Sequence, residues 1–194
     1  LTRVHQSPSE VAHIDALDVR LATHSEVSDT LLQTGPSWTR SEIDVDLAGE
    51  HATVDLGGVF IARGHQITDI HTTVSHNAAG VVSRQNYRGL AAEEGRGVFH
   101  GQIRVAAGAR GADATQSNKN MLLSRRSQIH STPALEILTD DVKCKHGSAT
   151  GQIDPAQLFY LRSRGIDVQD AARILTRAFA AEILEQAGVA VTPG

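Results

Sequence analysis

The chain has 194 residues, a formal net charge of −4 and a sequence pI near 6.2. That length can bury one good hydrophobic core, and the charge gives no electrostatic support for a nucleic-acid or acidic-membrane partner. No apolar run approaches the ~20 residues of a membrane span, and the single cysteine cannot form an internal disulfide. We therefore expect a cytoplasmic protein, or one of the plastid stroma if its source is a plant or an alga. Because the chain begins at Leu1 rather than Met, we also expect a piece of a longer protein.

Short β-prone runs, broken by Gly, Asn, Asp and Ser, fill residues 1–150, which we predict to be the core domain. The runs at residues 43–47 and 52–56 alternate apolar and polar side chains, as half-buried strands do. Runs return every 8–12 residues or so, a spacing that fits a sandwich, a barrel or a stacked solenoid. A weak echo favours the solenoid: Gly58-Val59-Phe60 returns as Gly97-Val98-Phe99.

Residues 151–194 are predicted to form a separate helical region. Asp154 and Pro155 are typical of a helix N-cap and first position, and Gly165 of a left-handed C-cap. Asp167 can cap a second helix, which Gly188 would end. The resulting hairpin could cap the β core or dock on another protein, and the sequence does not separate these two alternatives.

The only cysteine lies in a short run, residues 140–147, with strand character. On a strand, Cys144 and His146 share one face with Val142, about 7 Å apart, while Lys143 and Lys145 share the other. A thiol and an imidazole are half of a site for a soft metal or an iron–sulfur fragment, since such sites usually have four ligands. The two lysines should lower the pKa of the Cys144 thiol. The alternative is a small buried thiol beside a surface histidine.

Other chemistry-bearing motifs are weak or missing. The ten histidines include no pair at His-x-x-x-His spacing, and His71 and His76 would face opposite sides of a strand, so we interpret both as structural or solvated. Neither a phosphate-binding Gly-x-x-x-x-Gly-Lys-Ser/Thr loop nor a Gly-x-Ser-x-Gly nucleophile motif occurs. We therefore predict no catalytic residue and no cofactor-binding residue in this chain.

A set of ordered segments carries a family resemblance, at residues 86–89, 95–101, 115–124, 133–137, 140–147 and 157–166. Together they resemble the SufB/SufD family of iron–sulfur cluster assembly scaffolds, and residues 142–147 and 161–165 resemble its SufD branch. The resemblance is to the C-terminal portion of the family. It implies a right-handed parallel β-helix followed by a C-terminal helical region.

The resemblance also implies partners and site residues. Members of the family pair, SufB with SufD, through their β-helices, and each recruits one SufC ATPase through its C-terminal region. A nascent cluster is thought to form at the interface between SufB and SufD. His146 matches a SufD histidine implicated there, and Cys144 matches a position nearby, so both are candidate metal ligands. Phe159, Tyr160 and Arg162 are candidate anchors for SufC, because aromatic and Arg side chains dominate interface energetics.

We therefore expect a non-enzymatic scaffold subunit of iron–sulfur cluster assembly, which holds iron or a cluster only transiently. Its expected partners are SufB and the SufC ATPase, and the chain could form a homodimer in isolation. The alternative function is that of a β-helix lyase or hydrolase acting on carbohydrate, because fold alone does not fix function. The low aromatic content, 4%, argues against that alternative, since sugar-binding grooves usually present aromatic platforms.

Overall fold

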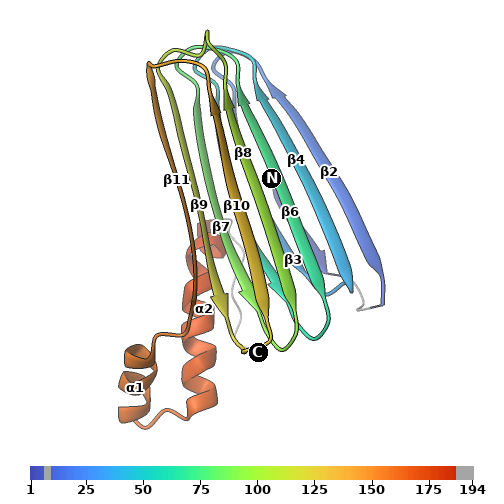
Figure 1. Cartoon of the computed structure of the whole chain (residues 1–194), viewed down its shortest axis with the longest axis vertical. Coiled ribbons are helices and arrows are strands. Elements are labelled where there is room, and N and C mark those ends of the chain that lie inside the picture. The colour runs from blue at the N-terminus through green and yellow to red at the C-terminus, as the bar shows by residue number, and fades with distance from the viewer. Residues whose placement is uncertain (7–9, 187–194) are drawn as a thin grey trace.

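The computed structural model describes residues 1–6 and 10–186, which form strands followed by two helices (Figure 1). The elements are β1 (Thr2–Gln6), β2 (Ala12–Leu21), β3 (Glu26–Thr34), β4 (Trp38–Leu47), β5 (Thr53–Ala62), β6 (Ile67–His76), β7 (Val82–Ala91), β8 (Arg96–Val105), β9 (Ala112–Leu122), β10 (Gln128–Ile137), β11 (Val142–Gln152), α1 (Pro155–Ser163) and α2 (Val168–Gln186).

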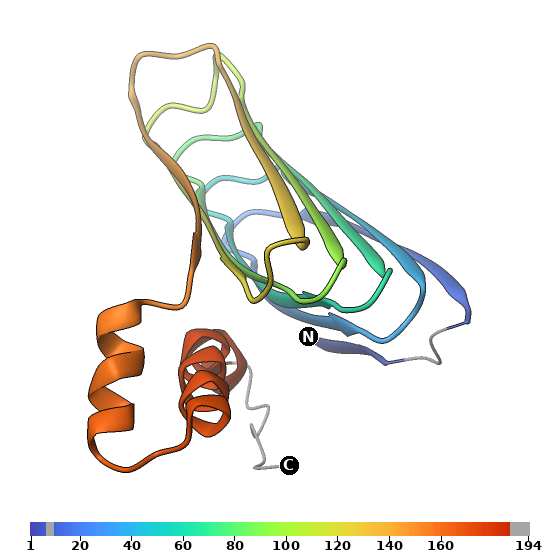
Figure 2. The same cartoon turned by 60° about the horizontal axis from the view of Figure 1, so that its bottom comes forward.

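The strands build two parallel sheets that face each other. Odd-numbered strands form sheet A in the order β1-β3-β5-β7-β9-β11, and even-numbered strands form sheet B in the order β10-β8-β6-β4-β2. Successive strands therefore alternate between the sheets, so the chain winds as a flattened tube (Figure 2). The predicted parallel β-helix is confirmed.

The structural repeat is shorter than the sequence echo suggested. Trp38 pairs with Ile67, and Ile67 pairs with Arg96, so these turns of sheet B are 29 residues apart. The two Gly-Val-Phe segments lie on β5 and β8, in different sheets, and are not equivalent positions of a repeat. The two Gly-Val-Phe segments therefore do not mark the structural repeat. Phe60 and Phe99 are nevertheless both fully buried.

Alternate side chains of each strand point into the tube and make its core. The inward positions of the middle strands combine aliphatic residues, for example Ile43, Val45 and Leu47 on β4, with small and polar ones, for example Ser83 and Gln85 on β7. The Tyr87 and Phe99 rings, whose centroids lie 5.0 Å apart, fill the space between the sheets. Because equivalent positions stack from turn to turn, one continuous core runs along the tube.

Helix α2 covers a side of the tube rather than an end. It packs on the outer face of sheet A, against β3, β5 and β7. A second apolar cluster forms there from Val59 and Leu90 of the sheet and from Ala180, Ile183 and Leu184 of α2. Of the two alternatives that the sequence left open, capping the β core or docking on another protein, α2 packs on the β core, whereas α1 has no buried residue.

The predicted helix boundaries agree with the structure where it describes them. The Asp154 side chain accepts a hydrogen bond from the Ala156 N–H at 2.8 Å, and Asp167 accepts one from the Gln169 N–H at 2.8 Å. Gly165 has φ +84°, in the left-handed region that favours glycine. The predicted end at Gly188, with the rest of residues 187–194, lies outside the described residues. Neither α1 nor α2 is long and apolar enough to cross a membrane.

Candidate functional site

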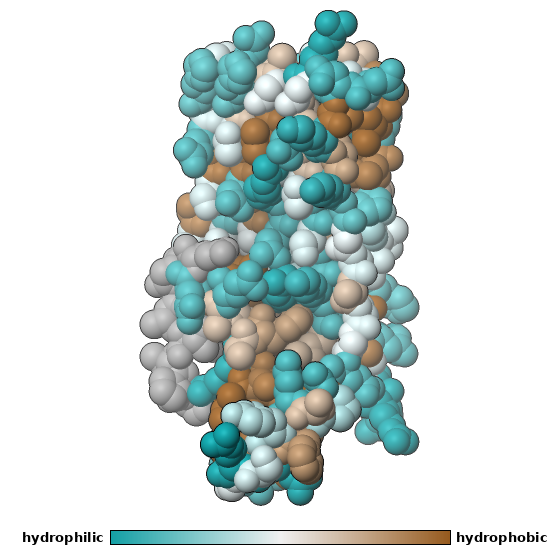
Figure 3. Space-filling model, turned by 90° about the vertical axis from the view of Figure 1, so that its left-hand side faces the viewer, coloured by the Kyte–Doolittle hydropathy of each residue, from teal (hydrophilic) through white to brown (hydrophobic). Residues whose placement is uncertain are grey.

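Strands β10 and β11 are the last strands of their sheets, and each has one edge without a neighbouring strand among residues 1–6 and 10–186. An unpaired strand edge presents a row of free N–H and C=O groups and is a template for pairing with another chain. Figure 3 looks at the side of the molecule where β11 lies and shows hydrophobic side chains among hydrophilic ones. Leu135 and Ile137 of β10 and Leu138, the residue after it, are exposed by 37%, 38% and 64%.

The Cys-x-His segment lies on β11. Its register places Cys144 beside Ala114 and His146 beside Gln116, both buried inward-facing residues of β9. Cys144 is half-buried and packs against the core, whereas His146 is exposed because no strand follows β11 in sheet A. The two side chains share a face, as the alternation of the strand predicted, and that face opens at the end of the tube.

The Cys144 thiol does not have the reactivity that the sequence suggested. Burial raises the pKa of Cys144, the Asp113 carboxylate raises it further, and a hydrogen bond with the Ala114 backbone lowers it only in part. The expected lowering by Lys143 and Lys145 was wrong, because both are exposed on the opposite face of β11 and their charges are screened by water. Near neutral pH the Cys144 sulfur is therefore a protonated thiol.

This chain supplies too few ligands at β11 to enclose a metal. Among residues 1–6 and 10–186, Cys144 and His146 belong to no group of three or more potential metal ligands. The His146 side chain makes no hydrogen bond or ion pair with the residues that the structure describes. Its ring nitrogens are therefore available to a ligand or to a second protein.

The interior beneath His146 is polar. Gln116, its neighbour on β9, donates from Nε2 to the Gln85 side-chain oxygen at 3.3 Å, and Thr72 donates to the same oxygen at 2.7 Å. Gly101 makes room for this amide, since a Cβ there would lie 2.2 Å from Gln116 Nε2. The Gln116 side-chain oxygen is buried and has no hydrogen-bond partner within the described residues. An unused acceptor therefore lies next to the exposed imidazole.

The predicted SufC anchors lie on α1, which follows β11 and contacts α2. Phe159 and Tyr160 are 72% and 57% exposed. Phe159 and Arg162 line a hollow of about 580 Å³ between α1 and the start of α2. Arg164 stacks over the Tyr160 ring at 5.2 Å, so Tyr160 is partly held by its own helix. Phe159 and Arg162 are the side chains that a partner could engage most freely.

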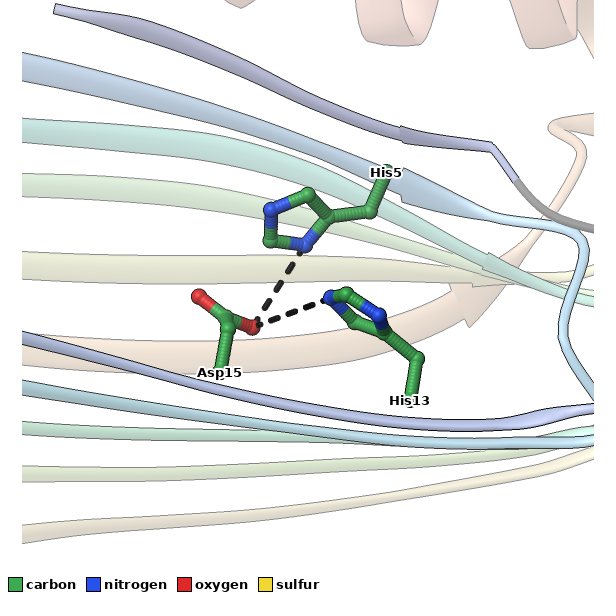
Figure 4. Close-up of side chains that lie close together, drawn as sticks. All are labelled: His5, His13 and Asp15. Atoms are coloured by element: carbon green, nitrogen blue, oxygen red, sulfur yellow. Dashed lines mark ion pairs between the residues drawn. The ribbon is translucent and has the colours of Figure 1, made fainter.

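A further cluster, which the sequence analysis missed, lies at the β1/β2 end of the tube (Figure 4). His5 of β1 and His13 of β2 both approach Asp15, with Nδ1 and Nε2 at 3.4 and 3.8 Å from Asp15 Oδ1. Burial lowers the pKa of His5, against the attraction of the Asp15 charge. His-x-Asp at positions 13–15 was a usable signal, but His5 comes from the other sheet and no spacing rule connects it to β2.

The comparison with protein families agrees with this architecture. Residues 1–179 match the family model described as "SUF system FeS cluster assembly, SufBD core domain". The chain therefore belongs to the SufB/SufD family of iron–sulfur cluster assembly proteins.

Individual relatives define its branch. The chain is 36% identical to the iron–sulfur cluster assembly protein SufD of Escherichia coli over 89% of this chain and 41% of that protein. It is 30% identical to SufD of Bacillus subtilis, over 76% and 34%. It is also 32% identical to the chloroplastic protein ABCI7 of Arabidopsis thaliana, over 90% and 37%. Within the family the chain is of the SufD type, and it spans less than half the length of these relatives.

Family membership favours one of the two functions considered from the sequence. A role in iron–sulfur cluster assembly is supported by the family model and by the names of the SufD relatives. The carbohydrate-active alternative rested only on the fold and has no such support.

Proposed function

We propose that this chain is a non-catalytic scaffold subunit that pairs, through the β10/β11 end of its tube, with the β-helix of SufB. The observation that carries the proposal is the open end itself, where two unpaired strand edges lie beside an exposed imidazole. Adding the strands of a partner would satisfy the free backbone groups and extend the parallel stack.

His146 and Cys144 would face the partner at such a junction. The two side chains supply a nitrogen and a sulfur, both good ligands for iron, but leave the remaining positions empty. Ligands from the partner would complete the site only when the two subunits are joined. Such a divided site holds a nascent cluster transiently, because neither subunit encloses it alone.

The main ligand in this proposal is His146 rather than Cys144. The imidazole is exposed and unpartnered, whereas the half-buried thiol must first lose a proton that its surroundings retain. Cys144 would bind once iron is present, because a metal stabilises the thiolate.

The test is cluster formation in a reconstituted complex of this chain with SufB and SufC. His146→Ala should leave folding and complex formation nearly unchanged, since an exposed side chain contributes little to the core. It should reduce the yield of assembled cluster sharply, by about tenfold or more if the imidazole is a ligand. Visible absorption and the activation of an apo iron–sulfur enzyme measure that yield.

His130→Ala is the matched control. His130 is an exposed imidazole on the adjacent edge strand β10, in register with Val98, and it points away from the tube. It should give the wild-type yield. Full cluster yield from a folded His146→Ala complex would refute the assignment, and an equal loss from both variants would mean that any change at this end disturbs pairing.

A further inference from the structure

Three potential metal ligands converge inside the β1/β2 end of the tube, opposite the end where His146 lies. His5 enters from sheet A, and His13 and Asp15 enter from sheet B (Figure 4). One nitrogen of each ring and a carboxylate oxygen all lie within 4.8 Å of one another. Ligand atoms around a tetrahedral zinc ion lie about 3.3 Å apart, given bonds of about 2.0–2.1 Å. Small rotations of the side chains would bring the three atoms to that spacing.

The two imidazole nitrogens nearest to Asp15 lack hydrogen-bond partners among the described residues. His5 Nδ1 and His13 Nε2 are buried and make no hydrogen bond with any residue in the described part of the chain. The rings lie close together, with centroids 4.5 Å apart and planes at 57°. A buried polar atom without a partner carries a desolvation cost, so two of them beside one carboxylate call for a ligand that would satisfy both.

The carboxylate is already fixed in position. Ser41 donates a hydrogen bond to Asp15 Oδ1 at 2.5 Å, and Arg3 donates one to Asp15 Oδ2 at 2.7 Å. Such outer partners orient a ligating carboxylate and are a regular part of protein metal sites. Arg3 occupies Oδ2, whereas Oδ1, the oxygen nearest to both rings, accepts from Ser41 and keeps a second lone pair with which to bind a cation.

The charges of this end also leave room for a cation. Arg3 pairs with Asp15 and, through Nε and Nη2, with the buried Asp29 at 3.0 and 2.6 Å. Two carboxylates thus face one guanidinium, with His5 and His13 as the remaining titratable groups of the cluster. With both imidazoles neutral, the cluster carries a net charge of −1. A bound cation would bring compensating charge and satisfy both orphan nitrogens, which a single proton cannot do.

We propose that His5, His13 and Asp15 bind one divalent transition-metal cation of the zinc or ferrous type. Two imidazoles and one carboxylate are a donor set that both ions accept in three-ligand protein sites with open positions. The side chains of the three residues are 16%, 33% and 18% exposed, so none of them is sealed in the hydrophobic core. This site is separate from the one proposed at β11 and does not depend on it.

Cobalt(II) binding to the metal-stripped 194-residue chain tests the proposal. Cobalt replaces zinc in nitrogen and oxygen sites, and its visible absorption reports the coordination, while a thiolate ligand adds an intense near-ultraviolet band. We expect one equivalent to bind with visible bands and without the thiolate band. Zinc should displace it and should raise the midpoint of thermal unfolding of the chain.

His13→Gln is the decisive variant, because the nitrogen that it removes makes no hydrogen bond and the fold should tolerate the change. It should weaken cobalt binding at least tenfold. His24→Gln is the matched control: His24 stacks on His51 with centroids 5.3 Å apart, a second imidazole pair, and belongs to no three-ligand group among the described residues. That variant should bind cobalt as the wild type does.

His146→Ala keeps this test distinct from the proposed function, since it should leave the cobalt signal unchanged. No stoichiometric binding to the wild type, or equal affinity in wild type and His13→Gln, would overturn the proposal. Loss of the signal in His24→Gln or His146→Ala would overturn it too, because the metal would then lie elsewhere.

Discussion

Single buried side chains give this tube a specific response to pH. His76 is fully buried, with Nδ1 3.2 Å from the Arg104 carbonyl oxygen and Nε2 2.9 Å from Ser83 Oγ. The Nδ1 proton donates to the carbonyl, so the neutral ring accepts from Ser83 through Nε2. Burial lowers the pKa of His76 below its ordinary value of 6.5, because the charged ring would lose its hydration.

We expect the free energy of unfolding to decrease as pH falls below 6.5. The unfolded chain then binds a proton at His76 more readily than the folded chain does, so acid favours unfolding until the lowered folded pKa is reached. One such histidine contributes at most about 1.4 kcal/mol per pH unit. His76→Gln should make the dependence shallower, although His5, whose pKa burial also lowers, retains part of it. Urea unfolding between pH 5 and pH 8 measures the slopes.

His65→Gln is the control, because the His65 side chain is 86% exposed. Its slope should equal that of the wild type. If His76→Gln and the wild type had the same slope, the buried ring would not be the origin of the acid sensitivity.

At the residue scale, the sequence predicts which side chains of one strand share a face. It does not predict contacts between residues on different strands. The common face of Cys144 and His146 follows from the two-residue period of a strand. The raised pKa of Cys144 does not, because it depends on burial and on Asp113 of the neighbouring strand. The meeting of His5 with Asp15 depends on how two sheets face each other, which no local pattern encodes.

The two helices differ in how they pack: α2 lies against sheet A, whereas α1 contacts α2 and buries no residue. Helix α2 buries Ile183 and Leu184 against sheet A, and Glu182 forms an ion pair with the buried Arg88 at 3.0 Å. Helix α1 buries nothing and contacts α2. Deleting both helices would expose Val59 and Leu90, so loss of SufC binding after such a deletion would not identify the contact.

Point substitutions on α1 provide a cleaner test of SufC recruitment. Phe159→Ala should leave stability unchanged, because the ring is 72% exposed, and should weaken SufC binding by about 1–2 kcal/mol or more if the ring is an anchor. Ile174→Ala, a change at a side chain of α2 that is 45% exposed, is the control and should retain affinity. Titration calorimetry with SufC gives both values, and equal affinities for wild type and Phe159→Ala would remove α1 from the proposed interface.

Helix boundaries were predictable because caps are local chemistry. Asp154, Gly165 and Asp167 act as the sequence indicated. The docking of α2 on the outer face of sheet A was not predictable, since it requires Val59, Ile61 and Leu90 to face outward from strands that also direct apolar residues inward.

The whole molecule is a stack with two ends of different character. Both ends present edge strands and exposed apolar side chains, for example Leu138 at the β10/β11 end and Ile14 at the β1/β2 end, and the β1/β2 end also holds the charged cluster around Arg3. The stacking was foreseen from short strands broken by turns, but the 29-residue turn length was hidden by sequence divergence between turns.

We expect the isolated chain to form a dimer through the β10/β11 end when SufB is absent, because an uncovered strand edge favours pairing. Leu138→Lys places a charge on this end at a side chain that is 64% exposed, and should shift the chain toward monomer. Ile14→Lys makes the same change at a side chain that is 67% exposed on β2, at the opposite end, and should remain dimeric. Sedimentation equilibrium distinguishes these cases.

A wild-type chain that stays monomeric at high micromolar concentration would contradict this expectation. Dissociation by Ile14→Lys rather than by Leu138→Lys would move the interface to the other end.

The position of α2 sets the order in which the tube can come apart. In a stack, each turn is held only by its neighbours. Helix α2 packs across β3, β5 and β7 and joins them, so the turns that contain these strands must loosen together. The β10/β11 turn makes none of these α2 contacts and is held from one side, so it can loosen without moving the turns under α2. The end proposed to pair with SufB can therefore change its strand register or twist while the turns that α2 covers keep their shape.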